Sequence, residues 1–366
     1  MHSARYERLI EGIWARGLDA LALVPGPNLF YVTGLSFHLS ERPIVALFPR
    51  EGRSAIVLPE LEAVKVEEDD EMVAFPYTDE EGPGDAFRRA CDALDLEGAK
   101  VGAEGLRMRL MEAQLLERCT DGGRLVTAEE LMASLRMQKD AHELDQMRSA
   151  VAITEGALKV TMDQVEAGMT EREVASLLSA ELLRGGGDAV AFSPIVVAGP
   201  NAALPHAVPG DRPIGAGEPI VVDCGASFGG YLADITRTFV IGELHEELSD
   251  VYDVVWAANA AGRAAVGPGV PAQAVDRAAR VVIEEAGYGD YFIHRTGHGL
   301  GLDVHEPPYI VAGNDKPLEP GMTFTVEPGV YLPGRGGVRI EDDVLVTEDG
   351  VETLTTFTRE VVSIPR

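Results

Sequence analysis

Four carboxylates and one histidine in the C-terminal half of the sequence are the residues best suited to do chemistry together. They are Asp223, Asp234, His298, Glu327 and Glu341. Acidic groups gathered in a low-dielectric pocket would repel one another and be driven to take up protons. A pair of bound divalent cations removes that repulsion and lowers the pKa of a bound water. The set therefore predicts a two-metal hydrolase, and oxygen-rich ligation with one imidazole suits Mn²⁺, Fe²⁺, Co²⁺ or Zn²⁺.

The first two carboxylates flank a predicted hairpin. Asp223 ends the apolar run EPIVVD, where a buried strand should stay apolar, so its side chain must be paired or act as a ligand. Asp234 follows across the turn GASFGG, which is long enough for the second carboxylate to return to the first. Because side chains alternate along a strand, Asp234, Thr236 and Thr238 are predicted to share one face.

The other three candidates also have local signals. Alternation over residues 322–326 places Glu327 at the end of the polar face of a strand. Arg339 and Glu341 are two residues apart, so we expect the guanidinium to enter the same cavity and to orient the carboxylate. His298 lies between two glycines, which permit a close approach of the backbone.

The first third of the chain alternates short apolar strands with helical patterns, which predicts a small α/β domain over residues 1–136. The strands are expected at residues 18–24, 43–49, 54–58, 72–77 and 99–103, and the helices at residues 86–94 and 108–118. A long helical pattern over residues 131–165 is broken at Lys139 and Asp140. We therefore place the domain boundary near Met137.

Residues 137–366 are predicted to form an α+β catalytic domain. Helices are expected at residues 171–183, 246–266 and 272–286. After Phe192, the sequence outside these helices consists of strand patterns separated by glycine and proline. This order predicts helices packed against a mostly antiparallel sheet.

Composition excludes several partners. The net charge of −29 argues against a nucleic-acid or anionic-membrane surface, since both require basic patches. We expect no membrane span and no signal peptide, because no long uncharged apolar run is present. Three cysteines without CxxC spacing predict a reducing compartment, hence the cytoplasm, and no disulfide framework. Cys224 is expected to be a small buried hydrophobic residue despite its place beside Asp223.

The motifs around these residues resemble those of a known family. They are GPNAALPHA, VVDCGASFGGYLADITRTF, TGHGLGLDVHEPP, EPGVY and GVRIEDD. They are similar to the pita-bread-fold metallopeptidases, in the branch with a creatinase-like N-terminal domain that contains the Xaa-Pro aminopeptidases and Xaa-Pro dipeptidases. The resemblance covers nearly the whole chain and is most specific in the second domain. It implies two divalent metal ions, with Mn²⁺ favoured, and a homodimer that acts on short proline-containing peptides.

The resemblance also assigns the metal ligands. Asp223 would bind one metal alone, and Asp234 and Glu341 would bridge both metals. His298 and Glu327 would complete the shell of the other metal.

Catalytic and substrate-binding roles follow from the same resemblance. Glu327 would handle the proton of the attacking water. His305 would stabilise the tetrahedral intermediate, and His206 would contact the substrate near the scissile bond. Imidazoles suit these roles because they are good donors to a developing oxyanion.

Four functions fit these motifs. We favour an Xaa-Pro aminopeptidase over an Xaa-Pro dipeptidase, whose substrate ends in a free carboxylate that needs a cation. Some dipeptidases of the family carry HExPR, whereas this chain reads HEPPY, with Tyr309 at the arginine position. Arg335 or Arg339 could supply the cation instead, so Arg339 is counted among the substrate-binding candidates.

The other two functions are a methionine aminopeptidase and a non-catalytic or metal-free pita-bread protein. The extra N-terminal domain and the text GVRIEDD argue against the first. A relative that has lost its metals should show replaced ligands, whereas all five candidates are present here.

Overall fold

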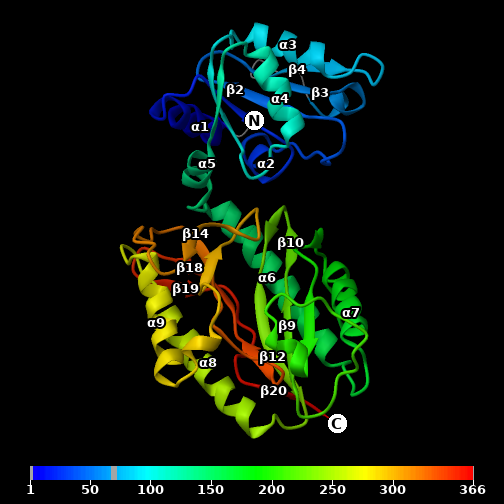
Figure 1. The fold of residues 1–366 in the computed structure, drawn as a ribbon, viewed down its shortest axis with the longest axis vertical. Coiled ribbons are helices and arrows are strands. Elements are labelled where there is room, and N and C mark those ends of the chain that lie inside the picture. The colour runs from blue at the N-terminus through cyan, green and yellow to red at the C-terminus, as the bar shows by residue number, and fades with distance from the viewer. Residues whose placement is uncertain (1–2, 67–71, 366) are drawn as a thin grey trace. The chain divides into compact units, whose positions relative to one another are not determined.

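The computed structural model describes residues 3–66 and 72–365 and divides into two compact units, Met1–Arg136 and Met137–Arg366 (Figure 1). Each unit has its own hydrophobic core and is described by itself. Among the described residues, no helix is both long enough and apolar enough to span a membrane.

The first unit is an α/β domain built on one mixed sheet with the strand order β4-β3-β2-β1-β5-β6. Strands β1, β2 and β3 pair antiparallel, and the other neighbours pair parallel. The strands are β1 (Ala20–Leu23), β2 (Val45–Pro49), β3 (Ser54–Pro59), β4 (Met72–Tyr77), β5 (Lys100–Ala103) and β6 (Arg124–Thr127). The helices are α1 (Ser3–Ala15), α2 (Pro27–Thr33), α3 (Gly84–Ala93), α4 (Leu110–Cys119) and α5 (Glu129–Arg136). All seven elements predicted for this unit are confirmed to within two residues at each end.

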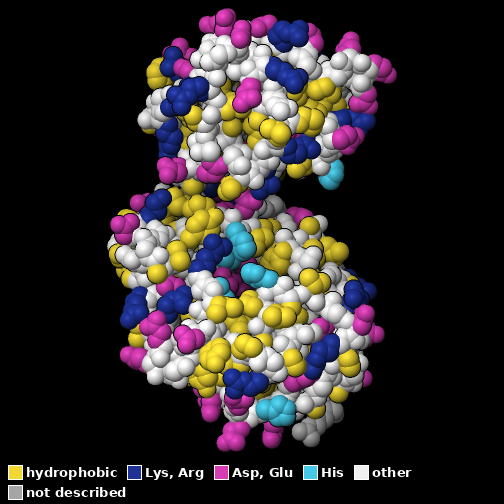
Figure 2. Space-filling view, viewed as in Figure 1, with side chains coloured by type: hydrophobic (Ala, Val, Ile, Leu, Met, Phe, Trp, Pro, Cys, Tyr) yellow, Lys and Arg dark blue, Asp and Glu magenta, His cyan; other side chains and the backbone are white. Residues whose placement is uncertain are grey.

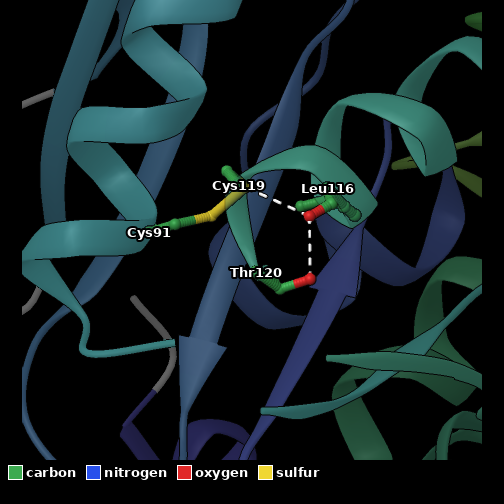
Figure 3. Close-up of a disulfide and its surroundings, with 4 residues drawn as sticks. All are labelled: Cys91, Leu116, Cys119 and Thr120. Carbon is green, nitrogen blue, oxygen red and sulfur yellow. Dashed lines mark hydrogen bonds between the residues drawn. A yellow bond between two sulfur atoms is a disulfide. The ribbon is translucent and has the colours of Figure 1, made fainter. Parts of the chain in front are cut away.

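The prediction of no disulfide was wrong. Cys91 in α3 and Cys119 at the end of α4 are joined, with their Cα atoms 5.9 Å apart (Figure 3). The two helices pack against each other, which brings together cysteines that are 28 residues apart in the sequence. The bond removes the thiol count as an argument for a reducing compartment. Cys224 is buried and free, and burial raises the pKa of its thiol well above the usual range.

The second unit has the predicted α+β layout. Helices α6 (Ala141–Met162) and α7 (Glu171–Arg184) pack together on one side of the strands, and α8 (Glu246–Ala264) and α9 (Ala272–Glu285) pack together on the other (Figure 1). Every strand pair in this unit is antiparallel except β12 with β20. Asp140 caps the first turn of α6 by accepting from the backbone of Glu143, which explains the break predicted in the helical pattern.

Two larger sheets carry the centre of this unit, with the orders β20-β12-β9-β8 and β14-β13-β15-β18-β19. Their strands are β8 (Ile195–Ala198), β9 (Pro219–Cys224), β12 (Ile235–Ile241), β13 (Gly297–Gly299), β14 (Glu306–Ile310), β15 (Thr323–Val326), β18 (Asp342–Val346), β19 (Val351–Thr353) and β20 (Val362–Ile364). Smaller sheets are formed by β7 (Ala189–Val190), β10 (Ala226–Phe228) and β11 (Tyr231–Leu232), and by β16 (Gly329–Leu332) and β17 (Gly336–Arg339).

Gly297 allows the backbone of β13 to lie against its neighbour. A Cβ atom at this position would lie 1.8 Å from the carbonyl oxygen of Thr325, and backbone atoms cannot move aside cheaply. Gly156, in the exposed part of α6, has open space around the corresponding position. The two glycines therefore form a matched pair for substitution by alanine.

We expect Gly297→Ala to lower the free energy of unfolding by at least about 2 kcal/mol, because the added methyl group forces a backbone shift. Gly156→Ala should raise it by about 0.5–1 kcal/mol, because alanine favours the helix. Denaturant unfolding of the two variants measures both changes. Equal stability of Gly297→Ala and the wild type would show that β13 tolerates a side chain here.

Candidate active site

All five candidate ligands line one cavity of the second unit, with a volume of about 560 Å³. Asp223 lies in β9, Asp234 directly precedes β12, and His298 is the middle residue of β13. Glu327 directly follows β15, and Glu341 lies between β17 and β18. Figure 2 shows histidine side chains around a recess in this unit, with acidic side chains inside it. The structure thus brings together residues that are up to 118 positions apart (341 − 223).

The side chains are close enough to share bound ions. Ligand atoms of Asp234, His298 and Glu341 lie within 4.8 Å of one another. The His298 Nε2 atom is 3.4 Å from Glu327 Oε1 and 3.9 Å from Asp234 Oδ2. Within the described residues, Asp223 Oδ1 and Asp234 Oδ1 are buried and lack a hydrogen-bond partner. Buried oxygens without donors are costly, so their presence here fits a site for divalent cations.

The electrostatics of the protein without metal show the same need for positive charge. Burial, together with the neighbouring carboxylates, raises the pKa of Asp234 and of Glu341 well above the usual range. Burial likewise raises the pKa of Glu327 to about 7, with the charge of Asp223 adding to the effect. Bound cations would reverse these shifts because they favour the ionised carboxylates.

His298 is held as a neutral ligand. Burial lowers the pKa of its imidazole to about 3, with a further contribution from His305. Its Nδ1 atom lies 3.2 Å from the carbonyl oxygen of Gly299, which accepts a hydrogen bond from the ring. The Nε2 atom is therefore the unprotonated nitrogen that faces the carboxylates, as metal ligation requires.

The predicted contact between Arg339 and Glu341 is indirect. Arg339 is buried and donates from Nη2 to Asp223 Oδ2 at 2.6 Å, and from Nε to the hydroxyl of Thr236 at 3.0 Å. That hydroxyl in turn donates to Glu341 Oε2 at 2.5 Å. Because Thr236 lies opposite Asp223 in the paired strands β9 and β12, it fills the space between Arg339 and Glu341. Arg339 thus positions Asp223 directly and Glu341 only through the threonine.

His206 and His305 lie exposed at the mouth of the cavity. The ring of His305 meets that of His298 edge-on, with centroids 4.1 Å apart. Desolvation on its cavity side lowers the pKa of His305, and the charge of Arg295 adds to the shift. His294 also lines the cavity, and its Nε2 atom is hydrogen-bonded to the hydroxyl of Tyr331 at 2.8 Å.

Two charged residues near the site were not predicted from the sequence. Asp343 accepts a hydrogen bond from the backbone of Asp234 at 3.0 Å, and burial raises its pKa well above the usual range. It could have been found from alternation, since it is two residues beyond Glu341. Arg295 lines the cavity three residues before His298, within the text HRTGHG.

The α+β second unit and its acid-lined cavity, joined to an α/β first unit, define a metallohydrolase of the pita-bread class. Comparison with known proteins supports this. Residues 145–348 match the model of metallopeptidase family M24, and residues 5–138 match that of the creatinase/prolidase N-terminal domain. This chain belongs to metallopeptidase family M24, so the predicted fold, family and enzyme class are confirmed.

Some of the similar proteins are named dipeptidase or prolidase, and others are named X-Pro aminopeptidase. The "Probable dipeptidase PepE" of Mycobacterium tuberculosis is 38% identical over 362 residues, which cover 95% of this chain and 93% of that one. The crystal structure of a prolidase from Thermococcus sibiricus has a TM-score of 0.95 and 36% identity and covers 99% of both chains. That of an X-Pro aminopeptidase from Thermotoga maritima has a TM-score of 0.84 and 34% identity and covers 98% of this chain and 100% of that one.

We expect the stabilisation by divalent metal to grow with pH. Without metal, the folded protein holds a proton on Glu327 up to about pH 7, whereas the unfolded chain releases it near pH 4.5. The free energy of unfolding of the metal-free protein should therefore fall as the pH rises between these values. Metal removes this cost, so the difference in Tm between Mn²⁺-loaded and EDTA-treated protein should be larger at pH 8 than at pH 5.5.

The isosteric variant Glu327→Gln provides the control for this pH dependence. It cannot ionise, so the decline in stability of its metal-free form between pH 4.5 and pH 7 should be smaller than that of the wild type. A metal-induced Tm difference that shrinks with rising pH would contradict the electrostatic interpretation of the cavity.

Proposed function

We propose that the five residues Asp223, Asp234, His298, Glu327 and Glu341 hold two divalent cations, and that the chain is an Xaa-Pro peptidase, in the first place a dipeptidase. The observation that carries the proposal is the convergence of these donors in one cavity, with two buried carboxylate oxygens that lack a partner among the described residues. When bound, the cations lower the pKa of water and polarise the scissile carbonyl. Mn²⁺ is the first metal to test, and a homodimer is the assembly that the family resemblance leads us to propose.

The residues of the chain divide the remaining work. Glu327 is placed to exchange a proton with the attacking water, because its carboxylate lines the cavity beside His298. His305 and His206 stand at the mouth of the cavity, where an imidazole N–H can donate to the oxyanion and to the substrate. Arg339 is better placed to position Asp223 than to bind substrate, because its guanidinium is buried and already donates to four acceptors.

The comparisons move our preference from the aminopeptidase to the dipeptidase. The name of the mycobacterial relative and the prolidase at a TM-score of 0.95 both point to substrates of two residues. A cavity of about 560 Å³ is of ordinary size for a small ligand and accommodates a dipeptide. The aminopeptidase remains the second candidate because Tyr309 occupies the position at which HExPR enzymes carry arginine, and because of the Thermotoga maritima neighbour.

Product analysis with Mn²⁺ separates the two activities. We expect the protein to cleave an Xaa-Pro dipeptide with a kcat/KM at least about 10-fold above that for the corresponding Xaa-Pro-Xaa tripeptide, since one paired charge contributes about 1.4 kcal/mol or more. Chromatography of the products at several substrate concentrations measures both values. Preference for the tripeptide would establish the aminopeptidase, and cleavage of neither peptide would contradict both.

Two histidine variants test the division between metal binding and catalysis. His298→Ala should lose bound metal and turnover together, because it removes the only imidazole of the proposed ligand set. His305→Ala should keep its metal content and lose about 100-fold in kcat, as expected for the loss of one donor to the oxyanion. Elemental analysis of the purified variants and steady-state kinetics measure these outcomes. Loss of metal from His305→Ala would assign that residue to the metal site instead.

A further inference from the structure

Two guanidinium groups line the cavity, and their surroundings differ. Arg339 is buried and donates to Asp223, Thr236, Tyr331 and the backbone of Pro205. The Arg295 side chain is half-buried, and no carboxylate of the described part of the chain forms an ion pair with it. Arg295 is therefore a cation at the reaction cavity whose hydrogen-bond donors are available to a ligand.

An aromatic ring holds this cation in place. The guanidinium carbon of Arg295 lies 4.5 Å from the centroid of the Tyr309 ring. Stacking on a ring face fixes the plane of a guanidinium and leaves its N–H groups, which point outward in that plane, free to form hydrogen bonds. Tyr309 lies opposite His298 in the paired strands β13 and β14, so the stacked pair stands beside a proposed metal ligand.

The charge of Arg295 also reaches the groups proposed to react. It contributes to the lowered pKa of His305 and opposes the raised pKa of Glu327. A carboxylate bound to Arg295 would thus lie within the same cavity as the scissile bond. The fork of a guanidinium matches the two oxygens of a carboxylate, and such bidentate pairs are among the stronger hydrogen-bonded contacts.

We propose that Arg295, stacked on Tyr309, binds the free C-terminal carboxylate of the substrate and so selects dipeptides. The assignment rests on the proposed Xaa-Pro activity and identifies the residue that sets its substrate length. Tyr309 then is a positioning residue. It stands where HExPR enzymes carry their arginine, and its ring holds Arg295, which comes from the neighbouring strand segment. A longer peptide, whose proline carbonyl continues into an amide, lacks the anionic partner.

The test compares two substrates that share the scissile bond, Ala-Pro and Ala-Pro amide, with the Mn²⁺-loaded full-length protein. Arg295→Met should raise the KM for Ala-Pro about 10- to 100-fold and change the kinetics of the amide less than about 3-fold. Arg295→Lys keeps the positive charge but cannot form a bidentate pair with a carboxylate. Its KM for Ala-Pro should therefore lie between those of the wild type and Arg295→Met. Arg335→Met is the matched control, because Arg335 is exposed, pairs with Glu247 and is absent from the cavity.

Variants of Tyr309 test separately whether its ring positions Arg295. Tyr309→Phe keeps the ring and should retain the wild-type KM for Ala-Pro, whereas Tyr309→Leu should raise that KM with kcat within about 3-fold of the wild type. Elemental analysis and Tm of every variant show whether the metal site and the fold persist.

Three results would overturn the assignment. Equal losses on Ala-Pro and its amide in Arg295→Met would show that Arg295 acts only through the general field of the cavity. An unchanged KM for Ala-Pro in the same variant would show that the carboxylate binds elsewhere. A wild-type protein that cleaves neither substrate would refute the proposed function itself, and the assignment with it, whereas the first two results leave that function standing.

Discussion

Repulsion among buried carboxylates is the constraint on which the second unit of this protein depends. Four of them line one cavity, and the buried cation among them is Arg339, so the centre carries a net charge of −3 when all four are ionised (−4 + 1). The raised pKa values of Asp234, Glu341 and Glu327 are the response of the protein without metal. Two divalent cations would bring the centre to +1, which leaves it suited to an anionic nucleophile or oxyanion.

The fold counters this repulsion with backbone hydrogen bonds that connect the ligand-bearing segments. The backbone of Glu341 donates to the carbonyl oxygen of Thr236 at 3.1 Å, and that of Glu327 donates to Thr296 at 2.7 Å. These contacts tie residues more than 30 positions apart in the sequence (327 − 296 = 31). Carboxylates carried by strands that are hydrogen-bonded to one another cannot move apart when they ionise. The fold therefore holds the metal-binding side chains in place before the cations bind.

Local patterns in the sequence were enough to predict the elements and to single out the five candidate residues, because each signal lies within a few neighbours. The alternation around Glu327 and the apolar run before Asp223 report the pleat of a strand, which is a local property. Contacts across the fold were not predictable in this way. Arg339 donates to the hydroxyl of Thr236, which lies in another strand. Cys91 meets Cys119 because two helices pack together.

The motif HEPPY shows why a single missing residue is a weak guide to substrate choice. Tyrosine stands at the strand position where HExPR enzymes carry arginine, which on the sequence alone favours the aminopeptidase. Recognition of a carboxylate requires a guanidinium at a place in space, not at a place in the sequence. Arg295 reaches the face of Tyr309 from before β13, so the charge that HExPR enzymes carry at this position is still within the cavity. If Arg295 binds the substrate carboxylate as proposed, another strand segment supplies the cation, and the tyrosine of HEPPY then no longer counts against a dipeptidase.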